Sequence, residues 1–593
     1  MDGERLYNAF AHGARELIKE KRSLNRINVF PVADNDTGNN MAHTARSMVE
    51  STEARESVSV VGRMMAEAAL TGARGNSGII FAQFLQGMSE GIGEKQALTP
   101  KEFVRAVRKA VDFAYGSTSE PVEGTILTVM KDWSVALRGL VEKRDDFVEL
   151  LSSSIGAAKS SLRQTPERLR VLKEEGVVDA GAKGFVIFLE GLTRALSQGK
   201  EAISAGYEEG GLKLQEEEER HMIHPQEIGG RRYCTEVLIG GEDLDREEIR
   251  EFVDSQGDST IVAGSKSKVR VHLHTDSPAE TVFWLEKKGE VLQQKVDDMK
   301  RQHDMVFDRQ SSIALVTDST CDLPQSIMDR FQIHMVPLNV AFGTNSYLDK
   351  RTITPRQFYR ALDEKEDYPS TSQPSMGSFI DLYRELSDNY DSVVSIHIAD
   401  KLSGTYRAAR SAAQKIPQAN ISVIDSRNLT SSLGLIVWKV AQAIADGASH
   451  EEAVRLAESC AGRAKVLVSV RDLKYMIRGG RVSPLKGFFA RLMGLKPIIS
   501  LDEEGNSELY GKAFSFAQNN SRIIEMLREV QREKGLDRYA IGHAHASDVA
   551  AEMKDRLERA LGQPASYVME ISPLIGAHSG VGAISVSYLS GTE

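Results

Sequence analysis

The chain has 593 residues, of which 41% are hydrophobic and 27% charged, and its formal net charge is -10. This length exceeds what one hydrophobic core supports, so we expect several domains of ordinary globular composition. Acidic and basic residues are mixed along the chain. That pattern excludes nucleic acid as an expected partner, because binding to a phosphate backbone needs a concentrated basic face.

Three isolated cysteines exclude a disulfide framework and favour a reducing compartment. The first residues lack the basic and then apolar layout of a signal peptide. No apolar run approaches the roughly 20 residues that a membrane-spanning helix needs. We therefore expect a cytoplasmic protein without an integral membrane segment.

From Leu6 to about Ser204, apolar residues recur at helical spacing, as in the series Phe103, Val107 and Ala110. Strand-like alternation is scarce there, so we predict an all-helical region. Residues 205–227 follow, with a run of glutamates and no apolar stripe. That composition is typical of a linker.

The segment from Asn28 to Met41 places Asp34 and Asp36 in one tight turn before a helical pattern. Neighbouring carboxylates repel each other, and a hard divalent cation is the usual remedy. Magnesium is typically held by one or two carboxylates together with substrate phosphates. The turn therefore predicts a metal–nucleotide site, with a solvated turn before a helix as the simpler alternative.

Three further segments of the helical region carry donors or small residues. Gly72–Gly78 is a donor-rich turn suited to phosphate oxygens, Glu123–Thr128 offers a helix start with a capping hydroxyl, and Val178–Gly184 would let a nucleotide base approach the backbone. Each is also typical of an ordinary helix cap. Neither a P-loop nor the protein-kinase signature set is present.

Between Tyr233 and about Asp304 the pattern changes to alternating strands with helical stretches, which predicts a small α/β domain. His272 and His274 are two apart on such a strand and so share a face, while Cys234 begins another strand. Two imidazoles and a thiolate can bind zinc with one position open. The alternative is two histidines on a solvated strand face beside a buried cysteine.

From Ser312 onward, strands alternate with amphipathic helices, which predicts parallel sheet with right-handed crossovers and ligands at the carboxyl ends of strands. The strands are expected at residues 313–317, 392–398, 421–425, 466–470 and 539–543. Three turns could hold a carboxylate: Pro369–Ser375, Leu402–Tyr406, and Pro573–Gly580, where glycines present His578 on a flexible loop.

The segments of the helical region, taken together and in this order, resemble the nucleotide-binding subunit of dihydroxyacetone kinase and, more closely, the ATP-binding domain of bacterial fatty acid kinase. The resemblance implies an eight-helix barrel with Mg–ATP at one end. In that pattern Asp34 and Asp36 hold Mg²⁺ and act with Thr37 in the transfer. The further residues implied to contact ATP are Asn28, Gly38, Asn39, Asn40, Asn76, Ser77, Gly78, Thr125, Asp179 and Gly181. The family usually has glycine at Asn35 and proline at Ala33.

Residues 228–308 resemble the middle domain of fatty acid kinase, through Tyr233–Glu236, Val271–Asp276 and Asp298–His303. In that family the matching cysteine and histidines form a metal-bound cluster. The resemblance therefore implies Cys234, His272 and His274 as ligands of Zn²⁺.

The C-terminal half, residues 312–591, resembles the DegV family through Val316–Pro324, Thr371–Ser375 and Ile575–Gly580. The family holds one fatty acid, with its tail in an apolar tunnel between two α/β lobes. The head group would be bound by Thr371, Ser372, Ser403, Gly404 and His578. The family often has a basic run where this chain has Phe514, which weakens head-group binding or moves the charge to Lys512.

We therefore expect a multidomain chain with a helical ATP-binding domain, a linker, a middle domain and a DegV-like domain, at residues 1–204, 205–227, 228–308 and 312–593. The predicted function is ATP-dependent phosphorylation of a long-chain fatty acid to acyl phosphate. A homodimer is expected, with acyltransferases of phospholipid synthesis as partners. Two alternatives stay open: a kinase for a dihydroxyacetone-like small molecule with a regulatory lipid-binding domain, and a non-catalytic lipid and nucleotide sensor.

Overall fold

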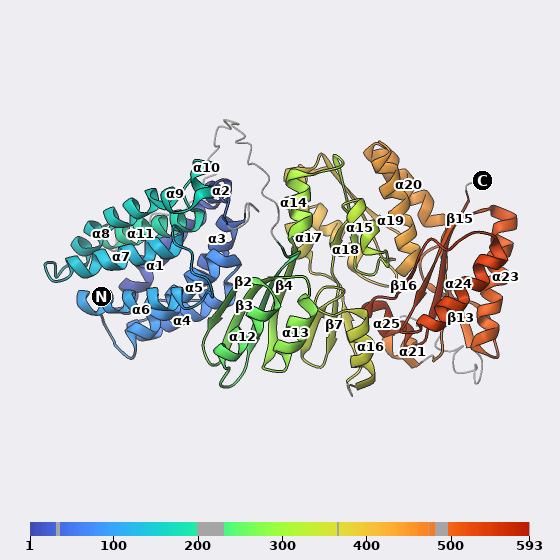
Figure 1. The fold of residues 1–593 in the computed structure, drawn as a ribbon, viewed down its shortest axis with the longest axis horizontal. Coiled ribbons are helices and arrows are strands. Elements are labelled where there is room, and N and C mark those ends of the chain that lie inside the picture. Colours follow the sequence, from blue (N-terminus) through green and yellow to red (C-terminus); the bar gives the residue numbers. More distant parts are fainter. Residues whose placement is uncertain (31–35, 199–229, 365–366, 473, 481–495, 592–593) are drawn as a thin grey trace. The chain divides into compact units, whose positions relative to one another are not determined.

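The computed structural model describes residues 1–30, 36–198, 230–364, 367–472, 474–480 and 496–591 (Figure 1). The predicted linker, residues 205–227, lies outside the described residues. The chain divides into two compact units, Met1–Gln302 and His303–Glu593. Each unit is built around its own cores.

The N-terminal part of the first unit is helical, as predicted. Its helices are α1 (Gly3–Lys19), α2 (Lys21–Arg26), α3 (Thr37–Glu50), α4 (Val58–Gly72), α5 (Gly75–Ile92), α6 (Pro100–Tyr115), α7 (Ile126–Leu140), α8 (Phe147–Arg163), α9 (Thr165–Arg168), α10 (Arg170–Glu174) and α11 (Ala180–Gln198). Helices that follow one another in the chain pack against each other, and α11 packs against α1 and α8.

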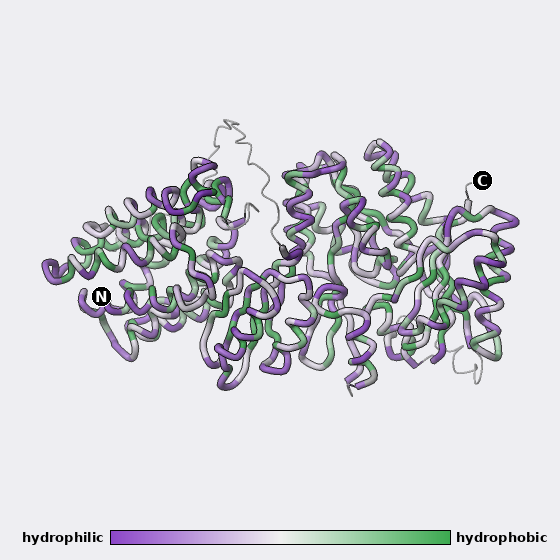
Figure 2. Tube along the Cα trace, viewed as in Figure 1, coloured by the Kyte–Doolittle hydropathy of each residue, from purple (hydrophilic) through white to green (hydrophobic). Residues whose placement is uncertain are grey.

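Helix α6 illustrates why these segments are helical. Thr99 and Glu102 form a reciprocal capping box, and Pro100 occupies the first turn, where its missing N–H costs nothing. One face then buries Phe103 and Val107 in the common core. Figure 2 shows the alternation of polar and apolar residues along the long helices.

The rest of the first unit contains a four-stranded antiparallel sheet with the strand order β2-β3-β1-β4. Its elements are β1 (Tyr233–Gly240), α12 (Arg246–Gln256), β2 (Asp258–Gly264), β3 (Lys268–Thr275), α13 (Pro278–Glu286) and β4 (Glu290–Asp298), and α14 (Met299–Phe307) follows. Helices α12 and α13 cover one face. The other face packs on the helical region, where Ile261 and Ala263 join the helical core.

The expectation of half-buried strands is therefore wrong for β3, which is buried on both faces. The interpretation of His272 and His274 as residues of a solvated strand face fails for the same reason, since they are 2% and 8% exposed. The helical region supplies the cover that a sequence pattern within the strand does not reveal.

The described residues of the second unit form three sheets. A four-stranded parallel sheet has the order β11-β10-β5-β6, a three-stranded sheet the order β8-β7-β9, and a six-stranded sheet the order β14-β13-β12-β17-β15-β16. The strands are β5 (Ile313–Asp318), β6 (His334–Val336), β7 (Asn339–Phe342), β8 (Asn345–Leu348), β9 (Ser370–Ser372), β10 (Ser392–His397), β11 (Ile421–Asp425), β12 (Ala464–Ser469), β13 (Lys496–Leu501), β14 (Ser507–Ala513), β15 (Leu536–His543), β16 (Val568–Glu570) and β17 (Ile584–Ser590).

Helices connect and cover these sheets. They are α15 (Gln325–Arg330), α16 (Pro355–Glu364), α17 (Met376–Asn389), α18 (Thr405–Ala413), α19 (Thr430–Ala445), α20 (His450–Arg463), α21 (Lys474–Gly479), α23 (Phe516–Lys534), α24 (Ser547–Leu561) and α25 (Pro573–Ser579). Helices α23 and α24 lie together on one face of the six-stranded sheet (Figure 1). Apolar residues of these two helices and the sheet form one core.

Parallel pairing is correct for β5, β10 and β11 and for β15 on its β16 side, but it is wrong for the strand expected at 466–470 and for the other side of β15. β12 and β15 both pair antiparallel with β17, which inserts between them, and β13 forms an antiparallel pair with β14. Each strand is followed by polar turns and helices in both arrangements. The local pattern therefore does not distinguish them.

Within the described residues, no helix combines the length and apolar composition needed to cross a bilayer. All three cysteines are free thiols.

Candidate functional site

One face of the four-stranded sheet gathers polar side chains from three strands. Cys234 and Glu236 alternate on β1, opposite His274 and His272 of β3. On its other side β1 pairs with β4, where Asp297 and Lys295 lie opposite the same two residues. Because side chains alternate along a strand and directly opposed residues share a face, all of these side chains project from one side of the sheet.

Three of these residues lie close enough to share a metal ion. The Sγ of Cys234 lies 3.8 Å from Nδ1 of His272. One ligand atom from each of Cys234, His272 and His274 lies within 4.8 Å of the others. Carboxylates adjoin both rings: Glu236 lies 3.5 Å from Nδ1 of His272, and Asp258 lies 3.6 Å from Nδ1 of His274.

Burial determines the protonation of this cluster. It lowers the pKa of His274 to about 3, with a further contribution from His272, so that His274 is neutral at pH 7. Burial raises the pKa of the Cys234 thiol, as do the charges of Glu236 and Asp297. Burial acts to raise the pKa of Glu236, but His272 and Lys295 outweigh it and hold that pKa at about 2.

The cluster fits a zinc ion. Neutral imidazoles and a cysteine sulfur are the donors that zinc prefers, and carboxylates beside the histidines are the usual outer partners. Nε2 of His272 is buried and has no hydrogen-bond partner among the residues that the structure describes. A cation would satisfy that nitrogen and would also favour the thiolate, which burial alone disfavours.

The first turns of two helices face this sheet. Asp36 is the residue before α3, and the hydroxyl of Thr37 donates to Oδ1 of the buried Asn28. Helix α5 begins at Gly75, whose N–H donates to Glu236 at 2.5 Å. Gly75 has φ +58°, and a Cβ there would lie 2.2 Å from Nδ2 of Asn40, so this close approach requires glycine.

The cluster on the sheet and the first turns of α3 and α5 line one cavity. From the helical region it is lined by Asn28, Asp36, Thr37, Asn40, Gly75, Asn76 and Ser77. From the sheet and α14 it is lined by Cys234, Glu236, His272, His274, Lys295, Asp297, Met299 and Gln302. Six of the predicted nucleotide residues and all three predicted zinc ligands therefore meet in one place, a relation the sequence did not suggest.

The oxygen donors of this cavity fit a magnesium ion. Asp36 supplies a carboxylate, and Oδ1 of Asn76 is buried without a hydrogen-bond partner in the described part of the chain. Carboxylate and amide oxygens together with substrate phosphates are the ligands of Mg²⁺ in kinase sites. Asp34 lies outside the described residues.

The remaining predicted nucleotide residues do not line the cavity. They are Gly38, Asn39, Gly78, Thr125, Asp179 and Gly181. The hydroxyl of Thr125 donates to the carbonyl of Val122 and does not cap α7, contrary to the expected capping role. Gly181 adjoins the cavity, since a Cβ there would lie 2.7 Å from Oγ of Ser77.

The Asp179 side chain stabilises the start of α11. Its carboxylate accepts the N–H of Ala182 at 2.7 Å, at the start of α11, while burial raises its pKa to about 6. Sequence reasoning missed Glu236, Lys295 and Asp297 as cavity residues. For Glu236 a signal existed, because it is two residues from Cys234 on the same strand and so shares its face.

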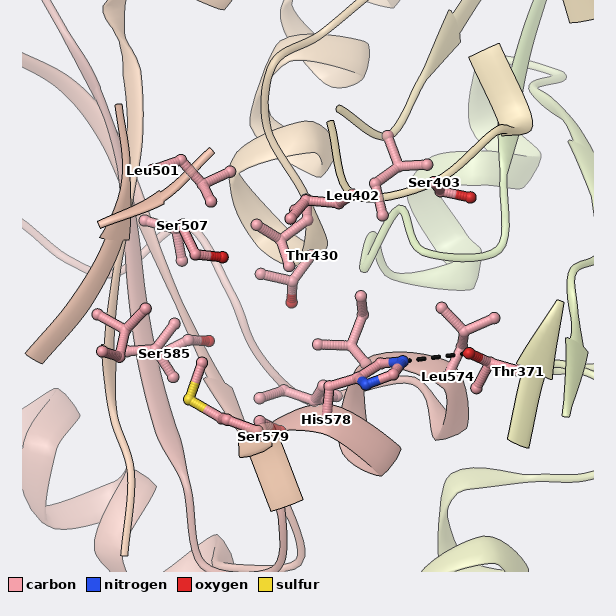
Figure 3. Close-up of a pocket in the computed structure, with 18 of the residues that line it drawn as sticks. Thr371, Leu402, Ser403, Thr430, Leu501, Ser507, Leu574, His578, Ser579 and Ser585 are labelled. Carbon is pink, nitrogen blue, oxygen red and sulfur yellow. Dashed lines mark hydrogen bonds between the residues drawn. The ribbon is translucent and has the colours of Figure 1, made fainter. Parts of the chain in front are cut away.

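The second unit contains a larger cavity, lined by strands of the three-stranded and six-stranded sheets, by turns that follow strands of the parallel sheet, and by α25 (Figure 3). Most of the lining is apolar. The apolar lining residues are Leu338, Ile398, Leu402, Leu429, Val466, Val468, Met476, Ile499, Leu501, Ile571, Leu574 and Ile575. The sequence pattern did not identify these residues as one cavity, because they come from strands and turns far apart in the chain.

Hydroxyls and a histidine lie together at one side of this cavity. Oγ1 of Thr371 lies 3.1 Å from Nε2 of His578 (Figure 3). Ser372 and Ser403 also line it, and the Ser403 hydroxyl adjoins that of Thr405 at 2.8 Å, at the start of α18. Gly404 does not line the cavity, but it packs on the Gln373 side chain, which would have to move to admit a Cβ there.

The expected flexible loop around His578 is instead a helix, α25. Pro573 occupies its first turn, and Gly576 N–H donates to the carbonyl of Ser572 at 2.8 Å. Proline at the start and glycine directly after the end are the usual helix boundaries. The glycines that suggested a loop are explained by packing, since a Cβ at Gly576 would lie 2.5 Å from the Tyr359 hydroxyl.

No lysine or arginine occurs among the described residues that line this cavity. Phe514 is 80% exposed, and Lys512 is exposed on β14 outside the lining. The predicted transfer of the charge to Lys512 has no support in this arrangement. The donors that the described lining residues offer to an anion are hydroxyls, the Gln373 amide and the His578 imidazole.

Three family models match this chain: the DAK2 domain at residues 31–194, the FakA-like middle domain of fatty acid kinase at 230–306, and the DegV family of uncharacterised proteins at 312–591. The first two suggest a kinase-type phosphotransferase.

Among curated proteins, YloV of Bacillus subtilis is 32% identical over 323 residues, 53% of this chain and 58% of that protein. An uncharacterized protein of Staphylococcus saprophyticus is 34% identical over 311 residues, 51% of this chain and 56% of that protein. The chain thus spans somewhat more than half the length of these curated relatives.

Among solved structures, a DegV family protein of Thermus thermophilus, described as fatty acid binding, is 31% identical, with a TM-score of 0.44. DegV of Bacillus subtilis, described as a fatty acid binding protein, is also 31% identical, with a TM-score of 0.45. Each match covers 47% of this chain and 99% of the other chain. The C-terminal half of this chain matches the DegV family and is joined here to regions that match a DAK2 domain and a FakA-like middle domain.

Proposed function

We propose that the chain is a fatty acid kinase with a built-in acyl carrier. An oxygen of the fatty acid carboxylate attacks the γ-phosphorus of Mg–ATP, and the bond from that phosphorus to the β–γ bridging oxygen breaks. The products are acyl phosphate and ADP, and no proton is needed for balance. Such transfer depends on positioning and on neutralising charge more than on covalent help from the protein.

The observation that carries this proposal is the shared cavity of the first unit. Asp36, with Asp34, would hold Mg²⁺, while Thr37, Asn40 and Ser77 would donate to phosphate oxygens. The start of α5 adds backbone N–H groups, which favour anions. Bound magnesium would neutralise charge on the transferring phosphoryl group.

The acyl acceptor would come from the cavity of the second unit. Thr371, Ser403 and His578 would hold the carboxylate there, with Ser372 and Gly404 beside them. Hydrogen bonds to an ionised group are stronger than neutral ones, so hydroxyls and an imidazole can hold a carboxylate without a lysine or arginine. The apolar lining supports this part because it suits a hydrocarbon tail, as does the 31% sequence identity to DegV proteins described as fatty acid binding.

Several further expectations belong to the same proposal. The long helices of the first unit would close into an eight-helix barrel, which the packing of α11 on α1 supports. The proposal also includes domains at residues 1–204, 228–308 and 312–593 and a zinc ion bound by Cys234, His272 and His274. It further includes a cytoplasmic location, a homodimer, and acyltransferases that use the product.

The test is to incubate the purified full chain with Mg–ATP and octadecanoic acid and to trap acyl phosphate as the hydroxamate with hydroxylamine. We expect trapping to depend on the acid. Asp36→Asn should lower the rate by at least about a hundredfold, because it removes a ligand charge at the transferring phosphoryl group. Asp112→Asn, on the exposed surface of α6, is the control and should retain activity.

A chain that binds octadecanoic acid but yields no hydroxamate would refute the kinase proposal and favour a sensor. The DAK2 match also fits a kinase that acts on a small molecule, and the same assay tests this alternative. ADP release stimulated by dihydroxyacetone, and not by octadecanoic acid, would establish that alternative.

A further inference from the structure

The acyl cavity of the second unit contains a second group of polar side chains, away from the Thr371–His578 pair. On the six-stranded sheet, Ser507 of β14 and Ser585 of β17 line the cavity. Figure 3 shows both hydroxyls directed inward from the opposite side of the view to Thr371. A hydrocarbon tail needs no polar groups in that position.

The sheet register shows that Ser585 belongs to the cavity face. It lies opposite Val468 of β12, and Val468 lies opposite Ile499 of β13. Both of these neighbours line the cavity. On β17 the flanking residues Ile584 and Val586 point the other way, into the core under α23 and α24.

Ser585 is 1% exposed, and its hydroxyl has no hydrogen-bond partner among the residues that the structure describes. Leaving a buried hydroxyl unpaired is costly, and such groups in native proteins usually pair with water or a ligand. A valine or alanine would line a purely apolar tunnel without that cost. Because Ser585 lines the cavity, a polar group on the ligand could pair with this hydroxyl, whereas a saturated tail could not.

We propose that the preferred ligand of this cavity is an oxygenated fatty acid, with a hydroxyl or keto group on the distal part of the chain that pairs with Ser585. The carboxylate would lie at Thr371 and His578, and the distal oxygen would meet Ser585, with Ser507 beside it. This inference rests on the proposed function and names its substrate class.

Ser587 provides a matched control. It lies two residues along β17 on the same face, is fully buried, and also lacks a hydrogen-bond partner within the described residues. Unlike Ser585, it does not line the cavity. Replacing either serine by alanine removes one buried hydroxyl, but only Ser585→Ala changes the ligand contact.

The test measures the affinity of the full chain for octadecanoic acid and for octadecanoic acids hydroxylated at carbon 10, 12 or 18, by competition with a fluorescent fatty acid. We expect at least one hydroxylated acid to bind roughly threefold to tenfold more tightly than octadecanoic acid. Ser585→Ala should remove that preference and Ser587→Ala should keep it. Thermal unfolding verifies that both variants are folded.

Equal or weaker binding of every hydroxylated acid by the unmodified chain would overturn the inference, whether or not either variant folds. So would a preference that survives Ser585→Ala. In both cases octadecanoic acid still binds and the proposed kinase stands. If neither kind of acid binds, the acyl-carrier part of the proposed function fails as well.

Discussion

Glu236 joins the helical region and the sheet within the first unit through two contacts of a single carboxylate. It accepts the N–H of Gly75 and lies beside Nδ1 of His272. Arg270 on the next strand lies 3.7 Å away and also donates to the carbonyls that end α4. The carboxylate therefore orients a proposed zinc ligand and fixes the first turn of α5 at the same time.

We predict that Glu236→Gln lowers zinc affinity by about tenfold to a hundredfold, because an outer carboxylate orients the ligating histidine and raises its basicity. Competition with a chromophoric chelator measures this affinity. Glu251→Gln, on an exposed position of α12, is the control. Unchanged zinc affinity in Glu236→Gln would show that this carboxylate does not support the metal site.

Asp349 is a buried carboxyl of the second unit beside the start of α25. It is fully buried and accepts the N–H of Leu574 at 3.4 Å. Burial raises its pKa to about 7, although Lys350 acts in the opposite direction. In the unfolded chain the same carboxyl has its ordinary pKa near 4.

The sign of the resulting pH dependence follows from proton binding. Between about pH 4 and 7 the folded state binds a proton that the unfolded state lacks, so stability falls as pH rises, by up to about 1.4 kcal/mol per pH unit. Asp349→Asn should flatten this slope in calorimetric unfolding of the full chain. Asp446→Asn, at an exposed position after α19, should leave the slope unchanged. A slope that persists in Asp349→Asn would show that the Asp349 carboxyl does not cause this pH dependence.

Helix α25 carries His578 and is anchored from outside the cavity. The Tyr368 hydroxyl contacts the carbonyls of Ala577 and Tyr475, at 2.5 and 3.1 Å, and so connects α25 to α21. Neither Tyr368 nor these carbonyls line the cavity. The position of His578 thus depends on a contact between elements.

We expect Tyr368→Phe to weaken fatty acid binding several-fold, because His578 loses the anchor of its helix while every cavity side chain is retained. Fluorescent fatty acid titration measures the affinity. Tyr510→Phe, a partly exposed tyrosine of β14, is the control. Full affinity in Tyr368→Phe would show that α25 holds its place without this hydroxyl.

The helices and strands show what sequence patterns can and cannot predict. Alternation placed Cys234, His272 and His274 on strands, and helical spacing identified the N-terminal region. The same patterns did not predict that β12 and β15 pair antiparallel with β17, because this strand lies more than forty residues beyond β15. They also missed α25, where glycines needed for close packing resembled a loop.

The candidate sites show the same limit. Asp36, Thr37 and Asn76 follow from local motifs, but Lys295 enters their cavity only through the register of β4 against β1. The apolar lining of the second cavity comes from the six-stranded sheet and from helices and turns far apart in the chain. Such long-range contacts leave little trace in a single sequence.

At the scale of the whole molecule, the proposed donor and acceptor sites belong to one chain in two compact units. A tether fixes their effective concentration, whatever the bulk concentration of protein. We therefore predict that hydroxamate formation per chain does not change when the enzyme is diluted a hundredfold at constant ATP and acid. Specific activity that falls on dilution would show that transfer needs separate chains to associate.

The place of β17 has a consequence for biosynthesis. This strand, residues 584–590, fills the gap between β12 and β15 and supplies Ser585 to the acyl cavity. While a ribosome is still translating the preceding residues, the two neighbouring strands expose unpaired edges, which are prone to aggregation. The cavity that we propose for the acyl chain can therefore form only after residues 584–590 have left the exit tunnel.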